Sequence, residues 1–117
     1  MTVLCLGSNA PDGEAKISEA MRMLQAKGCR VLASSPIYPS SHGYLNQVVA
    51  IDPGQYDRAV LTALTKWVER RLGRRPEMKS AGQVPIDIDI VILRGQTLRP
   101  ADFASPYFRQ GYSSINQ

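Results

Sequence analysis

The sequence predicts an α+β protein with the ferredoxin-like order β-α-β-β-α-β, an antiparallel sheet that carries both helices on one face. Three observations lead to this prediction. Four short apolar runs flank two longer segments in which apolar residues recur at helical spacing. Each helical segment is followed by a glycine, Gly28 or Gly73, where helices commonly end. The 117 residues are 44% hydrophobic and 21% charged, which is typical of one globular domain over residues 1–117.

The first half of the chain predicts a strand, a helix and two further strands. Residues 2–9, TVLCLGSN, form a short apolar strand that ends in turn formers. Asp12 can cap the helix that follows. Residues 30–38 and 44–52 are the second and third strands, joined by the loop PSSHG. The apolar positions of the helix, at i, i+3, i+4 and i+7, are Ile17, Ala20, Met21 and Leu24.

The second half predicts a helix, a polar loop and a fourth strand. The helix begins at about Tyr56, after the break at PGQ. Residues 74–85, RRPEMKSAGQVP, form a polar and basic loop, and the strand runs from Ile86 to Leu93. The tail from Gly95 onward shows no clear periodicity and is predicted to be irregular. The apolar stripe of the helix consists of Val60, Leu64, Trp67, Val68 and Leu72.

The charge of the chain suggests an anionic ligand. The net charge is +4, and basic residues concentrate between Arg70 and Lys79, directly before the fourth strand. This placement is compatible with nucleic acid or with a small polyanion such as a nucleotide. Cys5 and Cys29 lack metal-type spacing, so we expect free, buried thiols in a reducing cytoplasm. No apolar run approaches the roughly 20 residues of a membrane span, so a membrane partner is not expected.

Two aspartates interrupt the fourth strand in the run IDIDI, residues 86–90. The period of two places the three isoleucines on one face and both Asp87 and Asp89 on the other. Like charges at such positions repel, and Mg²⁺, which binds carboxylates together with phosphates and water, would remove the repulsion. The alternative is a hydrated outer face of the sheet. Because the chain lacks a P-loop and has a single histidine, His42, catalysis would rest on metal-assisted positioning of phosphates.

Four motifs then occur in a characteristic order. They are LGSN at 6–9, YLNQVVAI at 44–51, ERRLGRR at 69–75 and PIDIDIVI at 85–92. Together they resemble the 6-hydroxymethyl-7,8-dihydropterin pyrophosphokinase family of folate biosynthesis. The tail SPYFRQGY, 105–112, is similar to that family's proline-aromatic segment and glycine-aromatic pair. The resemblance implies transfer of a pyrophosphoryl group from ATP to the pterin's hydroxymethyl oxygen, which yields AMP and the pterin diphosphate.

The resemblance also implies a set of site residues. Asp87 and Asp89 would hold two Mg²⁺ ions that bridge the nucleotide phosphates, and the arginines would clamp those phosphates. The implied catalytic residues are Arg74, Arg75, Asp87 and Asp89. The implied pterin contacts are Gly7, Tyr44, Asn46 and Tyr112. The implied nucleotide contacts are Glu69, Arg74 and Tyr107.

The chain also departs from the family pattern. The loop before Tyr44 is short, and Ala81 and Val84 replace an aromatic residue and an arginine, while Pro76 replaces another arginine. These changes predict a weaker phosphate clamp and a reduced or lost activity. The first alternative is therefore a pterin- or nucleotide-binding homologue without turnover. The second is a basic RNA-binding domain, which the acids on the open sheet face disfavour. Nothing in the sequence selects an oligomeric state.

Overall fold

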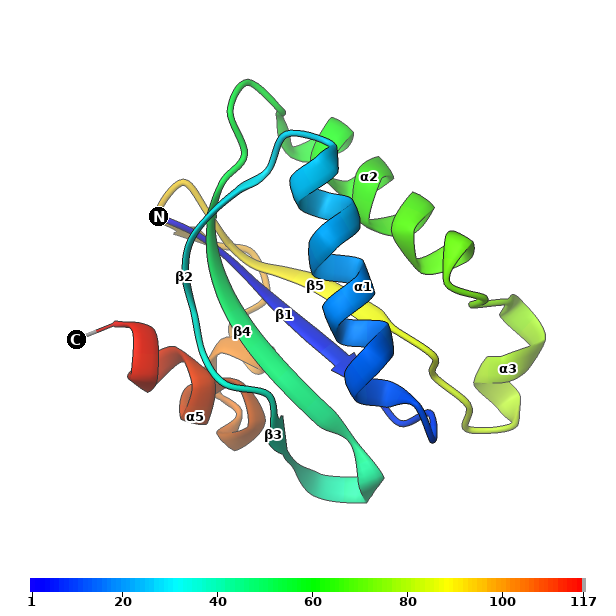
Figure 1. The fold of residues 1–117 in the computed structure, drawn as a ribbon. Coiled ribbons are helices and arrows are strands. Elements are labelled where there is room, and N and C mark those ends of the chain that lie inside the picture. Colours follow the sequence, from blue (N-terminus) through cyan, green and yellow to red (C-terminus); the bar gives the residue numbers. More distant parts are fainter. Residues whose placement is uncertain (117) are drawn as a thin grey trace.

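The strands form one antiparallel sheet in a computed structural model that describes residues 1–116 (Figure 1). Their order across the sheet is β2-β4-β1-β5-β6, and β3 pairs with β4. Antiparallel pairing of β1 with both β4 and β5 confirms the predicted ferredoxin-like arrangement. The strands are β1 (Thr2–Ser8), β2 (Arg30–Ser34), β3 (Tyr38–Pro39), β4 (Leu45–Asp52), β5 (Asp87–Leu93) and β6 (Gln96–Thr97).

Helices α1 (Gly13–Ala26) and α2 (Arg58–Arg71) cover one face of this sheet, as predicted. Their apolar side chains pack with those of Leu4, Val49 and Ile88 in one buried cluster. Asp57 caps α2, since its side chain accepts a hydrogen bond from the Val60 N–H at 2.9 Å.

Two predictions about these helices are wrong in detail. The Asp12 side chain makes no cap hydrogen bond and lies 3.9 Å from Lys16 instead. Val60 is 47% exposed, because the buried face of α2 is rotated toward Leu61, Thr65 and Glu69. Two of these three buried residues are polar, so a search for an apolar stripe misses them.

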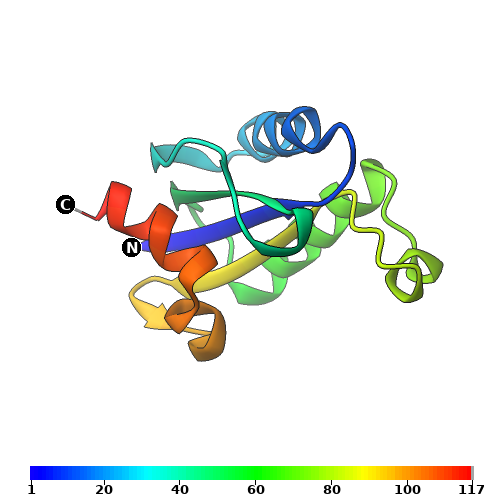
Figure 2. The same ribbon diagram turned by 90° about the horizontal axis from the view of Figure 1, so that it is seen from below.

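The basic loop and the tail contain helices that the sequence analysis did not predict. A short helix, α3 (Pro76–Ser80), begins at Pro76, a residue suited to the first helical turn. The tail forms β6 and then α4 (Pro100–Ala104) and α5 (Pro106–Ile115), so its predicted irregular structure is wrong. In Figure 1, α5 lies across the sheet from α1 and α2, and in both Figure 1 and Figure 2 it runs back toward the start of β1.

Helix α5 creates a second core on the other face of the sheet. Phe108 is fully buried there against Val3, Val48 and Val91. The helix approaches β4 closely because Gly111 has no side chain: a Cβ at this position would lie 2.6 Å from both the Tyr38 hydroxyl and Val48 Cγ2.

The cysteines are free and buried, as predicted, with Cys5 in the second core and Cys29 in the first. Within residues 1–116, no helix is both long and apolar enough to cross a membrane.

Candidate functional site

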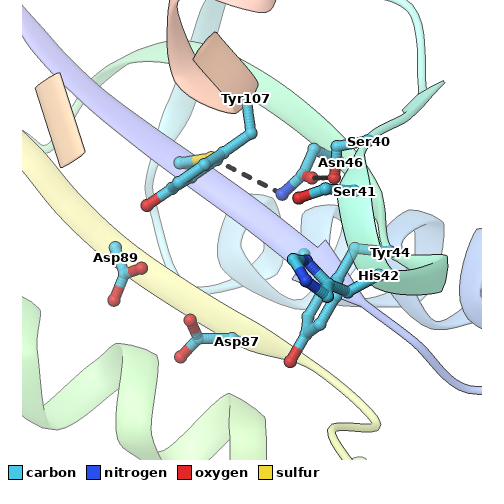
Figure 3. A pocket seen from close by; sticks show the side chains of 10 residues that line it. Ser40, Ser41, His42, Tyr44, Asn46, Asp87, Asp89 and Tyr107 are labelled. Carbon is cyan, nitrogen blue, oxygen red and sulfur yellow. Dashed lines mark hydrogen bonds between the residues drawn. The ribbon is translucent and has the colours of Figure 1, made fainter. Parts of the chain in front are cut away.

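Helix α5 covers only part of its face of the sheet, and a pocket of about 240 Å³ opens beside it on the uncovered part of that face (Figure 3). The sheet register builds its floor, since Gly7 of β1 lies opposite both Asn46 of β4 and Asp87 of β5, and Cys5 lies opposite Asp89. Residues of three adjacent strands, β4, β1 and β5, therefore lie side by side in the floor of the pocket. The lining residues are Cys5, Gly7, Ser40, Ser41, His42, Tyr44, Asn46, Asp87, Asp89 and Tyr107.

The two aspartates of β5 point into this pocket from the same strand face (Figure 3). Ile86, Ile88 and Ile90 are buried on the opposite face under the helices, so the predicted alternation is confirmed. Burial, followed by the negative charge of Asp87, raises the pKa of Asp89 to about 7, and the cation of Arg99 opposes the shift. The pair is thus a repulsive arrangement that a divalent cation would stabilise.

Arg74 joins this acidic pair to helix α2. Its Nη1 donates to Asp87 Oδ1 at 2.7 Å and lies 3.2 Å from Glu69 Oε1. Burial disfavours the charged guanidinium, but the hydrogen bond to Asp87 and the charge of Glu69 outweigh this effect and raise the pKa of Arg74. Arg74 is therefore a fixed cation beside Asp87.

Glu69 holds Arg74 from inside the protein. Its side chain is 3% exposed, and its Oε2 accepts a hydrogen bond from the Ile88 N–H at 2.8 Å. The same carboxylate therefore fixes the strand that carries the aspartates and orients the arginine that contacts them. The structure gives Glu69 these internal partners, although the resemblance implied a nucleotide contact.

Asn46 is held in a defined orientation at the floor of the pocket. Its Nδ2 donates to the Leu6 carbonyl at 3.2 Å, and its Oδ1 accepts from the Ser40 hydroxyl. Nδ2 also donates to Cys5 Sγ at 3.8 Å, so both of its N–H groups have partners, whereas Oδ1 keeps one lone pair for a further donor. Gly7 makes room for this side chain, because a Cβ on Gly7 would lie 2.8 Å from Asn46 Nδ2.

The two tyrosines of the tail, Tyr107 and Tyr112, have different surroundings. Tyr107 lines the pocket together with Tyr44, whereas Tyr112 does not. Tyr112 stacks on Phe108 at a centroid distance of 5.2 Å and meets Phe103 at 5.7 Å. Residues five apart on a helix are separated by roughly 140° around its axis, so α5 directs the two tyrosines differently. The structure therefore does not bring Tyr112 to the pocket.

Two basic hollows lie near the aspartates, and a third, with Arg74 and Lys79, borders Asp87 directly. One, of about 170 Å³, lies beside Asp89 and is lined by Arg58, Lys66 and Arg99. The other, of about 310 Å³, lies beyond Arg74 and contains Arg75 and Lys79. Arg75 therefore faces a different hollow from the one beside Asp89. Asp89 itself lines both the pocket and the hollow that contains Arg99.

The sequence does not predict every residue that lines the pocket or contacts the aspartates. His42, which the sequence identifies only as the single histidine, lines the pocket from the short turn Ser41–Gly43, where it adopts the left-handed φ of 60°. Arg99, which lies 3.8 Å from Asp89, belongs to a tail that showed no pattern. Only the position of His42, two residues before Tyr44 of the YLN motif, signalled its place at the site.

The aspartate pair fits a hard cation that completes its shell elsewhere. Within the described part of the chain, no three His, Cys, Asp or Glu side chains gather in a way that could hold a metal ion. Mg²⁺ commonly takes only one or two carboxylates and fills its other positions with phosphate oxygens and water. Asp87 and Asp89 suit that chemistry. They also make the uncovered sheet face repulsive to an RNA backbone, which argues against the RNA-binding alternative.

The fold and this pocket define a ferredoxin-like α+β protein with a candidate site built around a pair of acidic residues. The family model described as 7,8-dihydro-6-hydroxymethylpterin-pyrophosphokinase (HPPK) matches residues 3–108. The chain belongs to this family, as the four sequence motifs indicated.

Curated relatives agree with the assignment. Proteins from two strains of Porphyromonas gingivalis, each named 2-amino-4-hydroxy-6-hydroxymethyldihydropteridine pyrophosphokinase, are 39% identical to this chain over 100 residues. The match covers 76% of this chain and 66% of each relative. The chain thus spans slightly under two thirds of the length of these relatives.

Proposed function

We propose that the protein transfers a pyrophosphoryl group from ATP to 6-hydroxymethyl-7,8-dihydropterin in folate biosynthesis, within the cytoplasm. The observation that carries this proposal is the position of the two aspartates: both line a pocket with an aromatic ring and a fixed amide, and Asp89 also borders a hollow lined by cations. A planar heterocycle suits the pocket, and a polyphosphate suits the hollow. Family membership supports the same reaction.

In this proposal the pterin lies against Tyr44 and is read by Asn46. The ring of Tyr44 offers a flat apolar surface, and the remaining lone pair of Asn46 Oδ1 can accept from a donor on the pterin edge. The N–H that donates to Cys5 Sγ, a weak acceptor, can donate to the pterin instead. Because Ser40 and Leu6 already fix the amide, the Asn46 side chain is oriented for hydrogen bonding before the pterin binds.

ATP lies in the neighbouring hollow, with its phosphates directed toward Asp87 and Asp89. Arg58, Lys66 and Arg99 supply positive charge there, and Arg74 supplies it on the other side of Asp87. The hydroxymethyl oxygen forms a bond to the β-phosphorus, and the bond from the β-phosphorus to the bridging oxygen of AMP breaks. Two Mg²⁺ ions held by the aspartates would neutralise phosphate charge as this exchange proceeds.

Product analysis tests the proposal. We expect the protein, given ATP, MgCl₂ and 6-hydroxymethyl-7,8-dihydropterin, to form AMP and pterin diphosphate in equal amounts, with no AMP when the pterin is left out. Pterin that binds without any AMP formation would select the non-catalytic homologue instead. Absence of both binding and AMP would overturn the proposal.

Replacing Gly7 with alanine is expected to disturb the pocket floor. The new Cβ would collide with Asn46 Nδ2, so we expect a loss of about 1–3 kcal/mol in the free energy of unfolding, and pterin affinity about tenfold weaker. Urea denaturation and pterin titration measure the two effects. Gly54→Ala is the matched control. Gly54 has a positive φ but nothing within 4 Å of its Cβ position, so the substitution is expected to reduce stability through backbone strain and to leave pterin affinity unchanged. Unchanged pterin affinity in Gly7→Ala would show that the packing of Asn46 on Gly7 does not matter for binding.

Mg²⁺ binding is expected to weaken as the pH falls through about 7. Asp89 has its pKa raised to about 7 by burial and by Asp87, so below that pH a proton competes with the cation. Titration of MgCl₂ at pH 6 and pH 8, with a non-hydrolysable ATP analogue present, should show the weaker binding at pH 6. Equal affinities at both pH values would contradict the assignment of Asp89 as a ligand.

Asp89 also makes the stability of the metal-free protein depend on pH. Its folded-state pKa lies above the unfolded value of roughly 3.9, so the folded protein binds more protons between these two values. The contribution of Asp89 to stability is therefore expected to fall as the pH rises from about 4 to about 7. Asp89→Asn should remove this contribution.

A further inference from the structure

Tyr107 is held at both ends of the residue. Its backbone carbonyl accepts a hydrogen bond from the Tyr38 hydroxyl, and its own hydroxyl donates to Asp102. Burial raises the pKa of Tyr38 to about 12, and burial together with the Asp102 hydrogen bond raises that of Tyr107 as well, so both hydroxyls stay protonated donors. The ring is thereby fixed in direction as well as in position.

The attachment of α5 reinforces this position. Phe108, the next residue, is fully buried in the second core, and Gly111, one turn further, lets the helix sit directly on Tyr38. Because Tyr38 contacts the helix at both Gly111 and Tyr107, the start of α5 cannot shift without breaking a partly buried hydrogen bond or opening this packing. Tyr107 is therefore a rigid part of the pocket wall.

The hydroxyl end of Tyr107 connects to the acidic pair. Asp102, which accepts its hydrogen bond, also receives the Arg99 Nε, and that nitrogen lies 3.8 Å from Asp89 Oδ1. The side chains of Asp102 and Asp89 are each 20% exposed, so these interactions are only partly screened by water. One chain of polar contacts thus runs from the pocket wall to Asp89.

We propose that Tyr107 is a specificity-determining residue of the acceptor pocket, whose anchored ring forms the second aromatic wall for a planar fused heterocycle. Figure 3 shows this ring reaching over the sheet from α5, with Tyr44 at the other side of the pocket. The inference rests on the proposed function, because it assigns a wall to the pterin pocket. It gives Tyr107, and not Tyr112, the stacking role, and it places Tyr107 on the acceptor side and not on the nucleotide side.

The choice of substitutions follows from the contacts. Tyr107→Leu removes the flat ring and should weaken binding of the fluorescent 6-hydroxymethylpterin on the order of tenfold, because an aromatic contact is lost. Tyr107→Phe keeps the ring and the carbonyl contact to Tyr38 but loses the hydroxyl bond to Asp102, so its affinity should fall by only about twofold. Tyr38→Phe removes that contact and should weaken pterin binding about threefold, which tests positioning without altering the ring itself.

Titrations of 6-hydroxymethylpterin and of a non-hydrolysable ATP analogue with MgCl₂ test the proposal in the full chain, with the pterin titrated at saturating analogue. Thermal unfolding and circular dichroism verify that each variant is folded. The matched control is Tyr56→Leu, since Tyr56 is also half-buried with its hydroxyl bonded to a backbone carbonyl, that of Lys27, near the far end of the sheet. It should leave both affinities unchanged.

The expected result is a pterin affinity that falls in Tyr107→Leu and a nucleotide affinity that does not. A loss of nucleotide affinity with unchanged pterin affinity would overturn the proposal and return Tyr107 to the nucleotide side. A loss of pterin binding in Tyr112→Leu with none in Tyr107→Leu would likewise overturn it. If the wild-type chain binds no pterin, the proposed function itself fails, which is a separate outcome.

Discussion

Asp89→Asn is expected to lower the rate of pterin-dependent AMP formation on the order of 10³-fold, and Asp87→Asn by a similar factor. Both carboxylates face the same pocket, and each substitution removes half of the negative charge that would hold the cation. Asparagine keeps the size of the side chain, so the strand and its isoleucine face should remain in place. Initial rates at saturating ATP and MgCl₂ measure the effect.

The matched control for these variants is Asp52→Asn. Asp52 also lies on a strand and pairs with an arginine, Arg30, at 3.5 Å, but this pair is exposed and stands at the other end of β4. An exposed pair contributes about 0–1 kcal/mol, so the control should keep both its stability and its rate. Rates for Asp87→Asn and Asp89→Asn that match the control would contradict the account of the site.

Glu69→Ala is expected to reduce the free energy of unfolding by about 3 kcal/mol and to reduce activity as well. The substitution removes a buried carboxylate, so the Ile88 N–H loses its acceptor and Arg74 loses one of its two carboxylate partners. Because Arg74 also contacts Asp87, a less restrained arginine should disturb the phosphate side of the site. Chemical denaturation and initial rates measure the two effects.

Two further variants sharpen this test. Glu69→Gln can still accept from Ile88 but lacks the charge, so it should be more stable than Glu69→Ala while Arg74 remains less restrained. Glu19→Ala removes an exposed carboxylate paired with Arg22 on α1 and should change stability by less than about 0.5 kcal/mol. If Glu69→Ala were as stable as Glu19→Ala, the contacts that link Glu69 through Arg74 to Asp87 would not contribute to stability.

The sequence predicts the aspartate face well because the local pattern is strong. Alternation in residues 86–90 leaves one arrangement in which the isoleucines are buried, and a shift of one residue would bury both acids instead. The order of the strands across the sheet, in which β1 lies between β4 and β5, is a tertiary feature that this local pattern does not specify. The β-α-β-β-α-β order followed from these local signals.

The tail was harder to predict because its helix relies on a glycine. The inward positions of α5 are Phe108, Gly111, Tyr112 and Ile115, a spacing of i, i+3, i+4 and i+7 that is helical once Gly111 counts as a packing residue. A glycine in a short polar segment ordinarily indicates a turn. Here it permits close approach to Tyr38, which only the tertiary structure reveals.

Motifs alone do not predict the direction in which a side chain points. Glu69 is buried beneath the site and bonds to Ile88, and Tyr112 lies in the aromatic cluster behind α5. Both residues match family motifs, but a motif does not specify which side of a helix faces the pocket. Arg99 was missed because its link to Asp89 joins residues from β5 and the start of α4, a contact without any local pattern.

The most direct measurement of the central claim is ³¹P NMR of the reaction with ATP, MgCl₂ and 6-hydroxymethyl-7,8-dihydropterin. The account predicts AMP as the only nucleotide product and a pair of coupled diphosphate signals attached to the pterin, both absent when Asp89→Asn replaces the wild type. Formation of ADP, or of AMP with free pyrophosphate whether or not the pterin is present, would contradict pyrophosphoryl transfer at this site.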